Sequence, residues 1–143
     1  MGDALSMADA AIAVGEVPVG AVVVRQGKII GRGHNRTRID RDPTAHAEIV
    51  AIRQATRFLG NDRLEDCDLW VTLEPCTMCA GAIAHARIAR LYYGADDPKG
   101  GAVESGVRFF DAPTCHHRPD IYAGMEGERS AKMLLDFFQD RRA

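Results

Sequence analysis

The sequence predicts an α/β fold in which a central sheet carries helices on both faces. Short apolar runs rich in β-branched residues alternate along the chain with stretches of helical periodicity. The 143 residues fit one domain, and 46% hydrophobic with 27% charged residues is typical of a globular chain with a buried core. Because no repeat, low-complexity tract or linker divides the chain, we expect residues 1–143 to form a single domain.

Four stretches have apolar residues at the three- and four-residue spacing of a helix that buries one face. They are residues 4–14, residues 44–59, a stretch that begins at Pro75, and residues 127–141. Thr44 is expected as the N-cap of the second helix, Gly60 as its stop, and Pro75 as the first residue of the third. We expect Ile12 to face inward from the first helix, and Phe138 to lie on an apolar stripe of the last.

Five shorter runs predict strands. They are VGAVVV (19–24), IIGRGHN (29–35), DLWVTL (68–73), RLYYGA (90–95) and a short segment near Ile121. The RQGK stretch between the first two runs predicts a turn, so these two strands are expected to form a hairpin.

The composition argues against several classes of protein. Lys and Arg total 18 against 20 Asp and Glu, and a net charge of −2 gives no general attraction to nucleic acid. No apolar run approaches the roughly 18–20 residues of a membrane span, and the acidic N-terminal segment lacks the basic region of a secretory signal. We therefore expect a cytoplasmic protein without a membrane partner. The basic residues are almost all arginine, which suits phosphate contacts but also fits an arginine-rich proteome.

The stretch TLEPCTMCAGAIAHARI contains Cys76 and Cys79, three residues apart in the first turn of an expected helix. Helix N-termini favour thiolates, and residues at i and i+3 share a face, so both sulfurs can reach one ion. A redox pair would occupy the same strand-to-helix position. A structural zinc site needs four ligands, but the other cysteines and the adjacent His116 and His117 are irregularly spaced. The motif alone leaves these kinds of site open.

A second motif, PTAHAEIVAI, places His46 and Glu48 in the first turn of another expected helix. Alone it is weak, because a histidine near a glutamate is common on helix surfaces. Together, the two motifs predict His46, Cys76 and Cys79 as ligands of one zinc ion whose fourth position stays open, as in catalytic sites. Glu48 would reach the bound water without coordinating the metal, and is the predicted catalytic residue.

The HAE and PCTMC motifs resemble the H-x-E…P-C-x-x-C signature of the zinc-dependent cytidine and deoxycytidylate deaminase superfamily. Six longer segments resemble the bacterial tRNA adenosine deaminases, the TadA proteins, in the same order: EVPVGAVVV, GHNRTR, DPTAHAEIVAIR, LWVTLEPCTMCAGAIAHARI, YYGADDPKGGA and LLDFFQDRR. This resemblance covers nearly the whole chain. It implies the three-layer α/β/α cytidine-deaminase-like fold, with a central mixed sheet of about five strands.

The resemblance also implies an activity, namely hydrolytic deamination of adenosine to inosine at the wobble position of a tRNA anticodon loop, with one Zn²⁺ per chain. The implied partner is the tRNA anticodon stem-loop, bound by a homodimer, and no DNA is expected. The alternative within this class is the same chemistry on a free base or nucleoside such as guanine, cytosine or cytidine. Two hypotheses from other classes are a thiol–disulfide protein, which would leave His46 and Glu48 unused, and a structural zinc module that binds RNA without catalysis.

Three substrate-binding residues are implied by the resemblance. Asn35 in GHNR matches a position that hydrogen-bonds a base edge, whereas the plainer interpretation is a turn asparagine that bonds its own backbone. Asp97 matches a position near a flanking nucleotide, and its plainer interpretation is a solvated loop acid. Phe138 would line the pocket from the last helix, and a core aromatic is the plainer interpretation.

Overall fold

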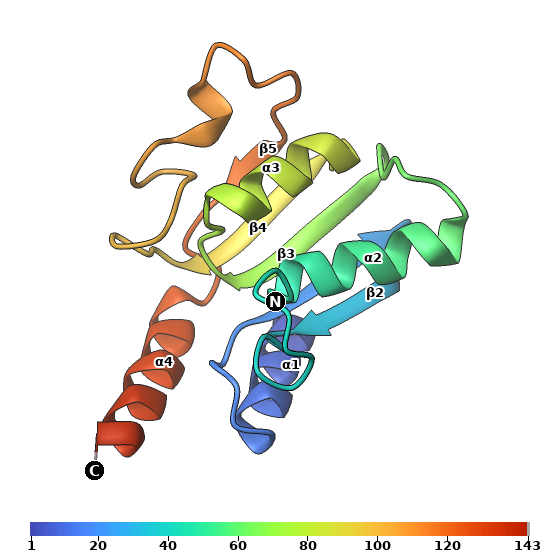
Figure 1. The fold of residues 1–143 in the computed structure, drawn as a ribbon. Coiled ribbons are helices and arrows are strands. Elements are labelled where there is room, and N and C mark those ends of the chain that lie inside the picture. The colour runs from blue at the N-terminus through green and yellow to red at the C-terminus, as the bar shows by residue number, and fades with distance from the viewer. Residues whose placement is uncertain (143) are drawn as a thin grey trace.

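The computed structural model describes residues 1–142 (Figure 1). Its elements in chain order are α1 (Gly2–Ala13), β1 (Gly20–Arg25), β2 (Lys28–His34), α2 (Ala47–Leu59), β3 (Cys67–Leu73), α3 (Thr77–Ala86), β4 (Arg90–Ala95), the 3-10 helix η1 (Phe109–Asp111), β5 (Asp120–Tyr122) and α4 (Gly127–Arg142). Every helix and strand expected from the sequence is present, in the expected order. Within the described residues, no helix combines the length and the apolar content that a membrane span needs.

The five strands form one mixed sheet in the order β2-β1-β3-β4-β5. β1 runs antiparallel to both β2 and β3, whereas β3, β4 and β5 are parallel to one another. β2 and β3 therefore run in the same direction, although β1 lies between them. Since their carboxyl ends lie at the same edge of the sheet, the segments that lead from them into α2 and α3 leave the sheet on the same side.

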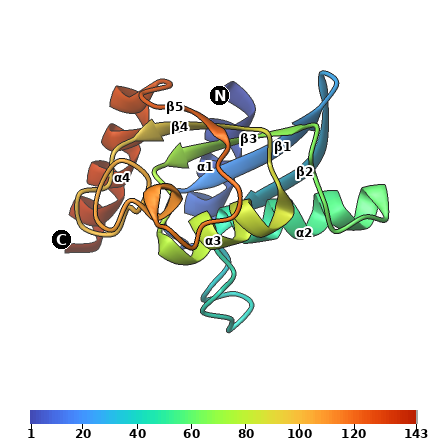
Figure 2. The ribbon, with the colours of Figure 1, turned by 90° about the horizontal axis from the view of Figure 1, so that it is seen from above.

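Two helices cover each face of the sheet. Figure 2 shows α2 and α3 together along one face, and α1 and α4 pack against the strands from the other. Successive strand residues face opposite sides of a sheet. A Cβ atom at Gly20 would meet α1, whereas one at Gly33, which pairs with the neighbouring Ala21, would meet α2. The three-layer α/β/α architecture and the mixed sheet are therefore confirmed.

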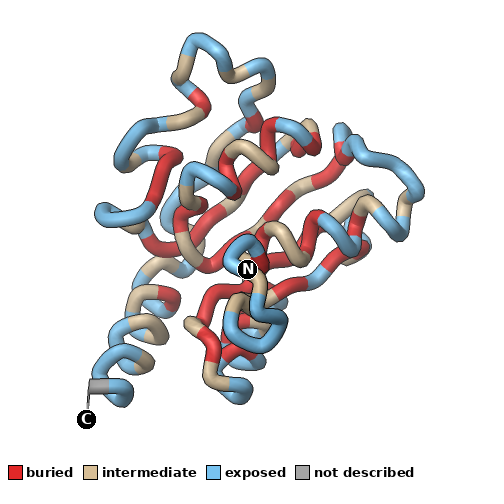
Figure 3. The backbone as a smooth tube through the Cα atoms, in the orientation of Figure 1, coloured by how far each residue is buried: buried red, intermediate tan, exposed pale blue. Residues whose placement is uncertain are grey.

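The main core fills the space between the sheet and the layer of α2 and α3. Figure 3 shows the buried residues along the central strands and along the helix stretches that face them. The sheet contributes large buried side chains such as Leu69 and Tyr93, whereas the buried apolar side of α2 is largely alanine. The small side chains of α2 allow its backbone to lie close to the β1–β2 hairpin, which fixes the position of the helix N-terminus.

The two helices at the shared edge begin later than the sequence predicted. α2 has His46, not Thr44, as its N-cap, because the backbone N–H and hydroxyl of Thr44 both donate to Asp42 Oδ1, at 2.9 and 2.7 Å. This local turn holds Thr44 away from the helix. α3 has Cys76 in extended conformation as its N-cap, so Pro75 precedes the helix instead of occupying its first position. Gly60 ends α2 in the left-handed conformation, as predicted.

The inner faces of α1 and α4 also differ from the prediction. Ile12 is 42% exposed, and the buried face of α1 holds small residues together with Leu5. On α4, Phe138 is 46% exposed, although the periodicity had placed it on the inner stripe. The reason is the close contact between Ser130 of α4 and Gly94 of β4. A Cβ added at Gly94 would lie only 2.6 Å from Ser130 Oγ. This contact sets the rotation of α4 and turns Phe138 outward.

We expect Gly33→Ala to destabilise the fold, because the new Cβ would lie 2.5 Å from Ala47 O and 2.8 Å from Ala51 N. Such overpacking costs about 1–3 kcal/mol in the free energy of unfolding, measured by urea denaturation. Gly81→Ala in α3 is the matched control, since its Cβ meets only one atom, at 4.0 Å. This substitution within a helix should add about 0.5–1 kcal/mol. Equal stability of the two variants would contradict the close contact between α2 and the hairpin.

Candidate metal centre and catalytic cavity

The N-termini of α2 and α3 meet at the edge of the sheet where β2 and β3 end. His46 and Cys76 are the N-cap residues of these two helices, and Cys79 lies in the first turn of α3. An N-cap side chain usually accepts a hydrogen bond from its own helix. Neither His46 nor Cys76 does so, and both side chains turn toward each other across the gap between the helices.

The ligand atoms of His46, Cys76 and Cys79 all lie within 4.8 Å of one another. His46 Nδ1 is 3.7 Å from Cys76 Sγ and 3.6 Å from Cys79 Sγ. A tetrahedral zinc ion with Zn–S bonds of about 2.3 Å and a Zn–N bond of about 2.05 Å separates N from S by about 3.6 Å. The donor types and their spacing therefore fit a zinc site, and the described residues contain no other such group of three.

The local electrostatics favour a thiolate at this cluster. A hydrogen bond from the Cys79 thiol, together with one from His46, lowers the pKa of Cys76 to about 4, although half-burial opposes the shift. The same contact with Cys76, and burial, raise the pKa of Cys79. The hydrogen bond to Cys76 raises the pKa of His46. The cluster therefore stabilises negative charge on Cys76 Sγ, and a thiolate is a donor that zinc prefers.

Glu48 is the second residue of α2 and only 4% exposed, although it carries a carboxyl group. Burial raises its pKa above the usual value for glutamate. Glu48 is not part of the group of three candidate ligands, but it lies close enough for the charges of Cys76 and His46, and a hydrogen bond with Cys79, to affect its pKa. A buried acid beside a metal-binding cluster is the arrangement expected of a group that exchanges protons.

A cavity of about 130 Å³ opens at this cluster. Its lining combines the candidate ligands and Glu48 with apolar and polar side chains: Val17, Val19, Asn35, His46, Glu48, Leu73, Glu74, Cys76 and Asp97. Asn35 Oδ1 accepts a hydrogen bond from the N–H of Ala47 at 3.0 Å. Its oxygen is therefore occupied, and the Nδ2 group is left to donate to a ligand in the cavity.

Comparison with known proteins gives the family. The MafB19-like deaminase family matches residues 1–142. The tRNA-specific adenosine deaminase of Agrobacterium fabrum is 63% identical over 127 residues, which is 89% of this chain and 84% of the relative. The chain belongs to the tRNA-specific adenosine deaminase family.

Two solved structures extend this comparison. One comes from a study of A-to-I editing by tRNA:A34 deaminases at the wobble position of transfer RNA; it is 61% identical, with a TM-score of 0.92 over 94% of this chain and 97% of that one. A guanine deaminase from Bacillus subtilis is 36% identical, with a TM-score of 0.65 over 99% of this chain and 90% of that one. The cytidine-deaminase-like fold and the place of this chain among the deaminases are therefore shown.

The other residues predicted from the sequence have different positions in this deaminase fold. Asn35 and Asp97 line the cavity, whereas Phe138 is not among its lining residues, so its role in substrate binding stays a prediction. Cys115 and His117, which the sequence left as possible ligands of a structural zinc site, lie outside the ligand cluster: the Cys115 thiol donates to His117 O, and His117 Nε2 lies 2.7 Å from Ile88 O. The sequence prediction omitted Glu74, a buried acid in the lining.

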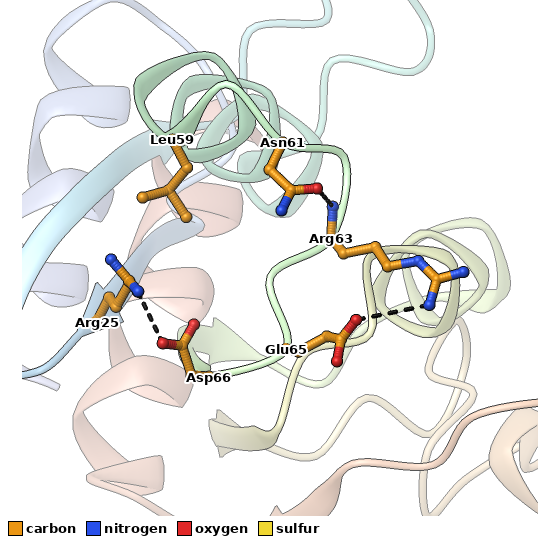
Figure 4. Close-up of a pocket in the computed structure, with 6 residues that line it drawn as sticks. All are labelled: Arg25, Leu59, Asn61, Arg63, Glu65 and Asp66. Carbon is orange, nitrogen blue, oxygen red and sulfur yellow. Dashed lines mark hydrogen bonds and ion pairs between the residues drawn. The ribbon is translucent and has the colours of Figure 1, made fainter.

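A larger cavity, of about 250 Å³, lies near the start of β3 and has none of the candidate ligands in its lining (Figure 4). Its charged side chains pair with one another, Arg25 with Asp66 at 2.8 Å and Arg63 with Glu65 at 3.5 Å. The hydrogen bond from Arg25 lowers the pKa of Asp66, so this exposed acid is held as a paired anion, and the cavity presents no buried acid or base comparable to Glu48. The smaller cavity at the cluster is therefore the catalytic candidate.

We expect the purified protein to hold about one zinc ion per chain, and Cys79→Ser to hold less than about 0.1, because a catalytic zinc site has only three protein ligands. Elemental analysis after dialysis measures both. Cys115→Ser is the matched control, since Cys115 lies outside the cluster, and it should keep its zinc. Equal zinc loss from the two variants would show that the donor set is wrong.

Proposed function

We propose that this chain deaminates adenosine to inosine at the wobble position of a tRNA anticodon loop. The observation that carries the proposal is the buried Glu48 beside the His46, Cys76 and Cys79 cluster, at a cavity with room for one base. Family membership supports the same reaction, because the relative from Agrobacterium fabrum is named for tRNA adenosine deamination. We propose further that residues 1–143 form a single deaminase domain, which acts as a homodimer in the cytoplasm.

The size of the cavity supports a substrate whose base alone enters it. Sites for whole drug-sized ligands usually measure about 300–1,000 Å³, and this cavity measures about 130 Å³. A planar base fits such a space, while the ribose and phosphates of an RNA strand stay outside. An unpaired anticodon base can be turned out of its stack into the cavity at a lower cost than a base in a duplex.

The proposed cofactor is one Zn²⁺ per chain, held by His46, Cys76 and Cys79. Zinc with three protein ligands supplies hydrolytic chemistry by lowering the pKa of a water molecule to about 7. The chain contributes the negative sulfur donors and the two helix N-termini that stabilise them. Burial of Cys79 and half-burial of His46 keep bulk solvent away from most of the cluster.

Glu48 is the proposed proton carrier. Its carboxylate takes a proton from the attacking water and delivers it to N1 of adenine, which makes C6 more electrophilic as the C6–O bond forms. Glu48 then passes the second water proton to the exocyclic amine, the C6–N bond breaks, and ammonia leaves. Water and adenosine thus give inosine and ammonia. A group that must both accept and donate benefits from a pKa raised toward neutrality, and burial raises the pKa of Glu48 in that direction.

Asn35 and Asp97 are the proposed substrate-binding residues at the cavity. Asn35 would donate from Nδ2 to an acceptor on the base edge, since its Oδ1 is bonded to Ala47 N–H. Asp97 lies at the start of the loop after β4, and its Oδ1 accepts from Lys99 N at 3.2 Å and Gly100 N at 3.0 Å. The remaining carboxylate oxygen is free of these two bonds, so it can accept from a nucleotide that flanks the base.

A second candidate is the same reaction on a free base such as guanine. The small cavity favours it, because nothing in a space of about 130 Å³ requires an attached RNA strand. The guanine deaminase from Bacillus subtilis, at 36% identity, has the same fold. We prefer tRNA because the similarity to tRNA deaminases is much higher, at 61–63% identity.

We expect Glu48→Gln to keep one zinc per chain but to lower kcat by about 10²–10⁴, because the amide can neither accept nor deliver the proton. Both proteins are incubated with total tRNA, adenosine, guanine and cytidine, and the nucleosides are analysed by mass spectrometry. Inosine should form only from tRNA, and about 10²–10⁴ times more slowly with Glu48→Gln than with the wild type. Product from guanine alone would contradict the proposed substrate, and normal turnover by Glu48→Gln would contradict the role of Glu48.

Asn35→Asp separates the two roles of Asn35, because aspartate keeps the oxygen that accepts from Ala47 N–H but loses the Nδ2 donor. We expect an unchanged melting temperature and a KM for the anticodon stem-loop raised by about tenfold or more, since one hydrogen bond to the base is lost. Asn61→Asp is the matched control, as Asn61 Oδ1 accepts from Arg63 N in a distant turn. An unchanged KM for Asn35→Asp would contradict the proposed contact with the base, and Asn35 would then only cap the N-terminus of α2.

A further inference from the structure

Glu74 is a charged side chain buried next to the candidate metal centre, for which the proposed reaction gives no role. It is 2% exposed, and its two carboxylate oxygens accept five hydrogen bonds, all from residues 97–105. The donors are the backbone N–H groups of Asp97, Val103, Glu104 and Ser105, at 2.9–3.0 Å, and the Ser105 hydroxyl at 2.8 Å. We call residues 97–105 the Glu74 loop.

The Glu74 loop is built around this carboxylate. An added Cβ at Gly101 would lie 2.5 Å from Glu74 Cδ and 2.6 Å from Asp97 O, so the loop backbone closes directly onto the acid. The donors from the loop surround both carboxylate oxygens, three at Oε2 and two at Oε1. Such a ring of N–H groups is a concave anion-binding site built from backbone.

Glu74 is also connected through the backbone to Cys76, one of the candidate metal ligands. Only Pro75 separates Glu74 from Cys76, and Pro75 O accepts a hydrogen bond from Ala102 N of the loop at 2.9 Å. The backbone N–H of Glu74 also donates to Ala95 O, at the end of β4. The turn that carries Cys76 and the loop that carries Asp97 are therefore joined at several points, and the cavity lies between them.

We infer that Glu74 is a positioning residue for substrate binding: it holds the Glu74 loop so that Asp97 stands at the wall of the cavity. This inference rests on the proposed function, since it assigns Asp97 to the RNA. Glu74 lines the cavity, but both of its oxygens are bonded to the loop, so it acts on the substrate through Asp97. Its removal should therefore weaken binding of the RNA more than it slows the chemical step at the cluster.

The test measures KM and kcat on an anticodon stem-loop RNA, with zinc content and circular dichroism for each variant. In Glu74→Gln an amide N–H₂ replaces one oxygen and faces backbone donors, so the loop shifts. We expect KM to rise about tenfold with kcat within about twofold of wild type and one zinc per chain. Asp66→Asn, at the distant paired cavity, is the control and should leave both constants unchanged.

Gly101→Ala displaces the same loop while every side chain that lines the cavity is kept, and it should raise KM in the same way. If Glu74→Gln does not fold, Gly101→Ala alone tests the inference. The decisive comparison repeats Glu74→Gln in an Asp97→Ala background. Because Glu74 acts through Asp97, the substitution should then change KM by less than about twofold.

Three outcomes would overturn the inference: an unchanged KM in folded Gly101→Ala and Glu74→Gln, a loss of activity that follows loss of zinc, or an equal rise in KM with and without Asp97. Failure of the wild type to deaminate any RNA would instead refute the proposed function. The two failures are therefore distinguishable in one set of assays.

Discussion

The site depends on one constraint, the approach of two helix N-termini whose N-cap side chains make no hydrogen bond to their own helices. His46 and Cys76 hold positions from which a side chain normally bonds the first turn of its helix. Here they turn to each other, and His46 Nδ1 lies 3.7 Å from Cys76 Sγ. Asn35 Oδ1 accepts from the N–H of Ala47, and the remaining N–H groups of the two first turns keep their partial positive charge at the site, where it favours a thiolate.

That approach is possible because small residues lie between α2 and the hairpin. Gly31 and Gly33 of β2 face α2 so closely that a Cβ on either would meet its backbone, at 2.3 and 2.5 Å. A larger residue would lift the helix by an appreciable fraction of an ångström. The two distances from His46 Nδ1 to the cysteine sulfurs, 3.7 and 3.6 Å, match the N–S separation of a zinc tetrahedron to within about 0.1 Å, so a shift of that size would disturb the donor set. The glycines of the IIGRGHN segment thus help to set the geometry of the candidate metal centre.

The sequence was enough to predict most of the fold and the cluster of candidate ligands. The predictions that were wrong failed for physical reasons. Periodicity gave the order of helices and strands, because burial of one face leaves a repeat in the chain. The motif spacing predicted that His46, Cys76 and Cys79 would come together. The predicted start of α2 at Thr44 was wrong because Thr44 donates to Asp42 in a local turn and does not cap the helix. The outward position of Phe138 follows from a contact between α4 and the sheet at Gly94, which no local pattern contains.

Three buried glutamates, Glu16, Glu48 and Glu74, differ in what surrounds their carboxyl groups. Glu16 accepts from the N–H groups of Arg38 and Ile39, and Glu74 accepts from four N–H groups and a hydroxyl. Such donors stabilise the anion, and they lower the pKa of Glu74 despite its burial. Glu48 is buried as well, but burial prevails and raises its pKa. Only an acid whose environment does not commit it to the charged form can exchange a proton cheaply, which is why Glu48 suits proton transfer while Glu74 suits the binding of a loop.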